Sequence, residues 1–185
     1  MNYSKHCDLC KNEQTNLKNG LTCSLTNRKP NFKDTCSKIN LNEKFQKKIE
    51  NINLELENRR KEKSSVLSNF YFLIVIGFTL IIGGFYFFKS NTKSVYAMQF
   101  SFGFISVGIT FLTIAYNKLN KFRREIYNAE FDKYELDDFL EKYGIEYKTE
   151  INFKEKIHGT QEVIVKVEYK NWKQKRTTTP YKINC

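Results

Sequence analysis

The sequence lacks the short motifs that identify the common enzyme classes. It contains no Walker phosphate loop, no dinucleotide-binding glycine fingerprint, no Ser-His-Asp order, no paired carboxylate motif and no His-Glu-x-x-His motif. Histidine is scarce, and His158 stands beside Gly159 in a predicted turn without a nucleophile or carboxylate pattern nearby. We therefore expect neither an enzymatic activity nor a small-molecule substrate, and we interpret His158 as a solvated turn residue.

Charged side chains are absent from two apolar segments, residues 69–88 and 95–116. At about 1.5 Å per residue, a helix of about twenty residues crosses the roughly 30 Å hydrocarbon core of a bilayer. Tyrosines stand near the ends of both segments, where the aromatic belts of membrane proteins lie. The pattern predicts a two-pass transmembrane hairpin over residues 69–116. Because neither apolar segment carries a charged side chain, a proton relay or an ion-coupled transporter is not expected.

A secretory signal is also missing, because residues 1–19 are polar, so we expect the first apolar segment to act as its own insertion signal. Basic residues flank the hairpin on both outer sides and are fewer in the link at 89–94, which predicts that both termini are cytoplasmic. Abundant asparagine and lysine point to a bacterium and hence to the inner membrane. Much of the net charge of +11 serves topology and attraction to anionic lipid, so no nucleic-acid partner is expected.

Small and polar residues follow one stripe of the second apolar segment at spacings of four and three. They are Gln99, Gly103, Ser106, Thr110, Thr113 and Asn117. The first segment offers Gly77 and Gly84, which lie level with about Gly108 and Ser101 of the second. We expect this polar stripe to be a packing surface within one chain or between copies. The alternative is that it lines a narrow water-filled path in an oligomer.

Four of the five cysteines lie near the N-terminus, at Cys7, Cys10, Cys23 and Cys36. The spacing C-x2-C-x12-C-x12-C gives one close pair of thiolates and two more distant ligands, as a tetrahedral zinc site requires. Stable disulfides are rare in the reducing cytoplasm. The segment has too few large apolar residues for a free-standing core, and a bound metal supplies the missing folding free energy in such modules. The sequence thus predicts one structural zinc per chain, with these four cysteines as its ligands.

This N-terminal module resembles a zinc-ribbon-like or treble-clef-like knuckle, and the resemblance is confined to residues 1–40. Those families usually present two close cysteine pairs, whereas Cys23 and Cys36 each stand alone, so His6 is an alternative fourth ligand. Four cysteines would close the coordination sphere, which argues against a catalytic zinc. An unmetallated or redox-active cysteine cluster and an iron–sulfur cluster are the other interpretations.

Amphipathic helical segments flank the hairpin. Their apolar residues recur at spacings of three and four: Phe45, Ile49, Ile52 and Leu56 before the hairpin, and Leu119, Phe122, Ile126 and Ala129 after it. We expect the transmembrane helices to continue into the cytoplasm and to pack there as an antiparallel, coiled-coil-like pair; homo-oligomerisation is the alternative use of these stripes. A further helix over residues 130–143 ends at Gly144.

Beyond Gly144 the apolar period changes to two. Residues 147–153 and 163–169 alternate apolar and polar side chains, which predicts a β-hairpin. We expect a third strand over residues 172–179, ended by Pro180, and a small sheet covered by helix 130–143. The basic cluster around Trp172 is interpreted as a lysine-guarded edge strand, with contact to lipid headgroups or a nucleotide as the alternative.

The predicted fold is a two-pass α-helical membrane protein in five parts. These are a cysteine-rich module (1–40), a juxtamembrane helix (41–68), the hairpin (69–116), a helical segment (117–144) and a small β-meander (145–185). We interpret the protein as an inner-membrane scaffold or adaptor, with copies of itself and an unknown protein as partners, that docks through an exposed strand edge. The alternative is a pore-type, membrane-disrupting effector of a bacterial defence or toxin system, gated by its cytoplasmic modules.

Overall fold

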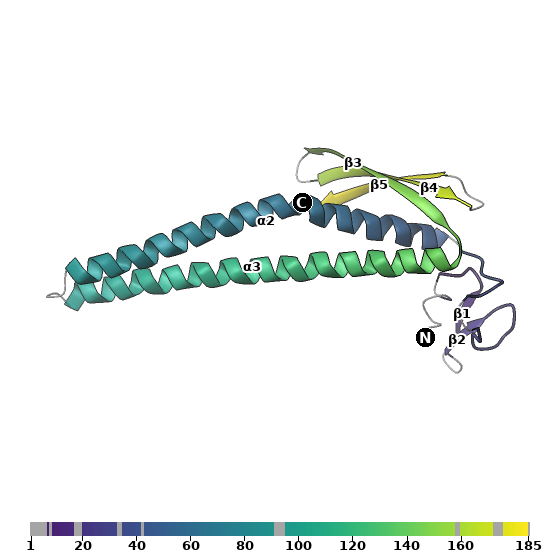
Figure 1. Cartoon of the computed structure of the whole chain (residues 1–185), viewed down its shortest axis with the longest axis horizontal. Coiled ribbons are helices and arrows are strands. Elements are labelled where there is room, and N and C mark those ends of the chain that lie inside the picture. Colours follow the sequence, from purple (N-terminus) through teal and green to yellow (C-terminus); the bar gives the residue numbers. More distant parts are fainter. Residues whose placement is uncertain are drawn as a thin grey trace. The chain divides into compact units, whose positions relative to one another are not determined.

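The computed structural model describes residues 7, 9–16, 20–32, 35–41, 43–90, 95–157, 160–171 and 176–184 (Figure 1). Its elements are β1 (Glu13–Asn16), β2 (Gly20–Cys23), α2 (Glu43–Ser90), α3 (Val95–Lys142), β3 (Glu146–Ile157), β4 (Thr160–Lys170) and β5 (Arg176–Asn184). The chain forms two compact units. The sheet unit comprises Met1–Glu57 and Glu130–Cys185, and the hairpin unit comprises Asn58–Ala129.

Both helices are 48 residues long and run without interruption from one unit into the other. The only prolines, Pro30 and Pro180, lie outside them, so no residue removes a helical hydrogen bond. The most apolar windows of α2 and α3 have mean hydropathies of 2.2 and 1.6, and both helices are long and apolar enough to cross a membrane. The predicted continuation of the two apolar helices into their flanking segments is confirmed.

In the hairpin unit, small residues bring α2 and α3 into close contact. A Cβ atom added to Gly108 would lie 2.8 Å from the carbonyl oxygen of Gly77, and one added to Gly84 would lie 3.1 Å from that of Ser101. Glycine is needed at these positions because a side chain would force the two backbones apart. The pairing of Gly77 with Gly108 and of Gly84 with Ser101 agrees with the prediction from the sequence.

The sheet unit contains an antiparallel sheet in the order β3-β4-β5. In the central strand, alternate residues from Val163 to Tyr169 are buried. They form one apolar cluster with residues from the start of α2 and the end of α3, including Phe45, Ile49 and Phe139. The apolar stripe at the start of α2 therefore packs on the sheet as well as on a helix, which its sequence period did not indicate.

The end of α3 and the first two strands follow the predicted pattern. Gly144 has φ +64°, and the Ile145 amide donates to the carbonyl of Leu140 across the turn that ends the helix. The prediction for the third strand was wrong at its end, because Pro180 lies inside β5, opposite Ile164. Proline is tolerated there because β5 is an edge strand. His158, Gly159 and residues 172–175 lie outside the described residues.

A second, two-stranded sheet pairs β1 with β2, with Glu13 opposite Cys23. It belongs to the sheet unit together with the cysteine segment. The predicted five-part division of the chain, and the coiled-coil character of the helical extensions, stay predictions.

Candidate functional site

The four predicted zinc ligands line one cavity of about 390 Å³ in the sheet unit. Cys10 is buried, Cys7, Cys23 and Cys36 are partly buried, and all four are free thiols. Within the described part of the chain, no three histidine, cysteine or acidic side chains stand close enough together to hold a metal ion. The structure thus gathers the four cysteines around a shared space without a closed coordination shell. His6 lies outside the described residues.

Tight turns position three of these cysteines. The carbonyl of Cys7 accepts a hydrogen bond from the Cys10 amide at 2.9 Å, and the carbonyl of Cys36 accepts one from the Ile39 amide at 3.2 Å. The Asn40 amide also donates to Sγ of Cys10 at 3.4 Å. The thiolate is the form of a cysteine that binds a metal. Four thiols are the donor type that a soft cation such as zinc prefers, but in the described structure they do not stand close enough together to hold one.

The cavity disfavours ionisation of its thiols. Burial, and then the neighbouring thiols of Cys10, Cys23 and Cys36, raise the pKa of Cys7 to about 11. A cluster of thiols resists ionisation because each new thiolate repels the others. A bound divalent cation has the opposite effect: it lowers the pKa of the thiols that bind it, so that they lose their protons.

The cysteine segment is joined to the rest of the sheet unit through its own residues. Leu9, between Cys7 and Cys10, is buried in the apolar cluster of the sheet and helix ends. The Cys36 amide donates to the hydroxyl of Tyr143 at 3.0 Å, and Cys10 forms an antiparallel bridge with Leu41. The metal-ligand candidates are therefore packed against the end of α3, which the spacing of the cysteines did not reveal.

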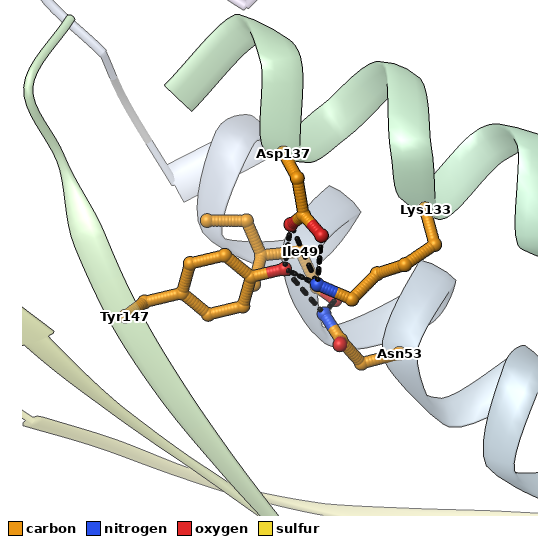
Figure 2. Close-up of polar contacts among 5 residues, drawn as sticks. All are labelled: Ile49, Asn53, Lys133, Asp137 and Tyr147. Atoms are coloured by element: carbon orange, nitrogen blue, oxygen red, sulfur yellow. Dashed lines mark hydrogen bonds and ion pairs between the residues drawn. The ribbon is translucent and has the colours of Figure 1, made fainter. Parts of the chain in front are cut away.

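A polar network ties the two helices of the sheet unit to β3 (Figure 2). The Tyr147 hydroxyl donates to Asp137 at 2.8 Å, and it accepts hydrogen bonds from Lys133 and, at 3.3 Å, from Asn53. Lys133 also pairs with Asp137 at 2.6 Å and lies over the Tyr147 ring. Burial raises the pKa of Tyr147. Because α2, α3 and β3 each contribute to the network, it fixes their relative placement.

Glu50 on α2 forms a second link, to β5. Its carboxylate is buried and accepts hydrogen bonds from the hydroxyls of Thr179 at 3.0 Å and Tyr181 at 2.7 Å. Hydrogen bonds to a charged group are stronger than neutral ones, which offsets part of the cost of burying a carboxylate. In the sequence, Glu50 was indistinguishable from the solvated charges of an amphipathic helix.

The polar stripe of α3 does not face α2. All six of its residues are exposed in the hairpin unit, and nothing lies within 4 Å of a Cβ atom added to Gly103. The hydroxyls of Thr110 and Thr113 bond to carbonyl groups of their own helix, those of Ser106 and Ile109. The stripe was expected to pack within one chain or between copies; the first of these is therefore wrong, and the second stays a prediction. A separate face of α3, which includes Ser101, Gly108 and Ala115, makes the contact with α2.

Comparison with known proteins assigns the chain to no family. The chain matches no protein-family model, and no curated protein or solved structure is similar to it. No family is recognised for the whole chain, which agrees with a resemblance confined to residues 1–40.

Proposed function

We propose that the protein is a two-pass inner-membrane scaffold or adaptor with both termini in the cytoplasm and with no enzymatic activity of its own. The helices support a membrane location because only 11% of each apolar window is buried within the structure, whereas the core helix of a water-soluble protein is mostly buried. Large exposed residues such as Phe72, Phe85, Phe100 and Ile109 cover the apolar parts of both helices. Lipid is the solvent that matches such a surface.

The scaffold proposal rests mainly on which segments of the chain make up the sheet unit. The first part of α2 and the last part of α3 both belong to it, so the cysteine segment and the sheet are attached to two apolar helices. In this proposal the cysteine segment holds one structural zinc. Elemental analysis of protein purified under reducing conditions should find roughly one zinc per chain. A metal-free protein that is otherwise folded would remove the zinc from the proposal.

The proposed docking surface is the free edge of β5. Among the described strands, β3 and β5 each pair with β4 alone, so each has an open edge. Charged side chains along β3 guard its edge, whereas Thr177, Thr178 and Thr179 of β5 are uncharged. Pro180, which follows them, has no N–H donor, so the docking is expected along the threonines. An extended segment of a partner protein can add to such an edge through main-chain hydrogen bonds.

A pair of crosslinking positions tests this docking. Thr178 of β5 and Glu150 of β3 face Lys166 of β4 from opposite sides, so they stand at the same level of the sheet on its two edges. A photoreactive amino acid at position 178 should capture one defined protein in the producing cell, and the same group at position 150 should not. Equal capture at the two positions, or none at either, contradicts the β5 surface.

The outward polar stripe favours a second candidate function, a pore-type effector of a bacterial defence or toxin system. In an oligomer, Gln99, Ser106, Thr110 and Thr113 would line a shared path. A potential-sensitive dye separates the two functions during expression in a bacterium. A scaffold should leave the membrane potential intact. Depolarisation that disappears when these four residues are replaced by leucine would refute the scaffold and establish the pore.

A further inference from the structure

A cavity of about 220 Å³ lies between α2 and α3 within the hairpin unit. Its apolar lining comes from both helices: Val66, Phe70, Leu73, Leu119 and Phe122. These residues flank the points where the charge-free segments begin, at residue 69, and end, at residue 116. If the helices cross a bilayer, the cavity lies at the level of the lipid headgroups on the side of the chain termini.

The polar rim of this cavity carries an unbalanced positive charge. Glu62 and Glu125, which line it, each lie 3.2 Å from the guanidinium of Arg59. Lys121 lies 3.9 Å from Glu125. Lys118 also lines the cavity, and no carboxylate among the described residues pairs with it. The lining thus holds two ammonium groups and two carboxylates, and the guanidinium of Arg59, which is not part of the lining, adds a third positive charge beside the carboxylates. Lys118 is the cation for which the described residues supply no carboxylate partner.

We propose that this cavity is a binding site for one anionic phospholipid. The headgroup phosphate complements Lys118, and the first methylene groups of an acyl chain cover the apolar lining that would otherwise stay open. The inference rests on the proposed membrane location of the hairpin. It goes further, because general attraction to anionic lipid needs only a density of basic residues, whereas this site needs a cavity and one particular lysine.

The test uses the full chain reconstituted in vesicles with equal amounts of phosphatidylglycerol and phosphatidylcholine. Lipid that remains bound after gentle detergent extraction is counted by native mass spectrometry. Lys118→Gln removes the unpaired cation, and Val66→Phe fills the cavity without changing the charge. Lys63→Gln is the matched control, because Lys63 is an exposed basic residue outside the cavity lining, near the same end of the apolar segment.

The wild type and Lys63→Gln should each retain one phosphatidylglycerol molecule. Retention should fall about tenfold in Lys118→Gln, since a hydrogen bond to a charged group contributes about 1.5 kcal/mol, and it should also fall in Val66→Phe. Equal losses in the two lysine variants, with no loss in Val66→Phe, overturn the site in favour of diffuse attraction.

Carbonate extraction of the same membranes separates this inference from the proposed function. A chain that carbonate releases overturns the membrane location and the lipid site together. A chain that stays in the membrane but shows no difference between Lys118→Gln and Lys63→Gln overturns the lipid site alone.

Discussion

The close contact of α2 and α3 predicts opposite effects for the same substitution at two glycines of α3. In Gly108→Ala, the new Cβ would lie 2.8 Å from the carbonyl oxygen of Gly77 and 2.7 Å from Cγ1 of Ile81. In Gly103→Ala, it would meet nothing within 4 Å. The two positions belong to one helix, and the chemical change is identical, so each variant is the control of the other.

The magnitude follows from two terms. Replacing glycine by alanine inside a helix gains about 1 kcal/mol of helix propensity, and this term is common to both variants. Ordinary contact of a Cβ begins near 3.4 Å, so Gly108→Ala must push the helices apart by about 0.6 Å. Overpacking of this kind costs about 1–3 kcal/mol. The difference between the two variants isolates the packing term and should therefore be about 1–3 kcal/mol, with Gly108→Ala the less stable.

Equilibrium unfolding of the hairpin in mixed detergent micelles measures this difference. A fluorophore pair on clickable amino acids at positions 64 and 120 reports separation of the two helices as the fraction of denaturing detergent rises. Gly108→Ala should separate at a lower fraction than the wild type, and Gly103→Ala at an equal or higher one. If Gly103→Ala is the more damaging variant, α3 meets α2 through its polar stripe and the contact described here is incorrect.

Three further predictions concern the sheet unit. Leu9→Ala should lower the stability of the sheet unit by about 3 kcal/mol, because the substitution leaves a cavity at a buried site. Amide hydrogen exchange in β4 should then become roughly a hundred times faster. Leu25→Ala is the control and should change little, because Leu25 is exposed. Glu50→Gln should lower the free energy of unfolding by about 1.5 kcal/mol, because the hydroxyls of Thr179 and Tyr181 lose a charged acceptor. Amide hydrogen exchange should become faster first in β5. Burial raises the pKa of Tyr169 from 10.0 to about 12, so the stability it contributes below pH 10 should be lost as the pH rises toward 12. Tyr169→Phe should therefore lose less stability than the wild type between pH 10 and pH 12, and an identical loss in the two proteins would contradict this.

The apolar helices and the first two strands were predictable because local patterns determine them. A charge-free run of about twenty residues has few uses outside a membrane or a core, and strict alternation fits only a half-buried strand. The end of the third strand was not predictable. Proline ends a central strand but is tolerated at an edge, and only the pairing order shows that Pro180 lies at an edge.

The face by which α3 meets α2 was predictable only in part, because the sequence indicated the pairing of Gly77 with Gly108 and of Gly84 with Ser101 but also allowed the polar stripe to pack within the chain. The polar stripe and the face that includes Ser101, Gly108 and Ala115 both recur with helical spacing, so periodicity allows either to make the contact. Which face of α3 contacts α2 depends on which one places small residues opposite Gly77 and Gly84. The same limit applies to the cysteine segment. Spacing predicts the ligands, whereas the burial of Leu9 depends on residues far away in the chain.

The network of Lys133, Asp137 and Tyr147 has a consequence for evolution. Loss of the tyrosine would leave a lysine and a carboxylate beside an empty space, and loss of the lysine would leave Asp137 without its cation. Each single replacement costs stability that a second replacement can restore. Lys133, Asp137 and Tyr147 should therefore be inherited or replaced as a set, so that homologues either keep all three or carry an apolar substitute at all three positions.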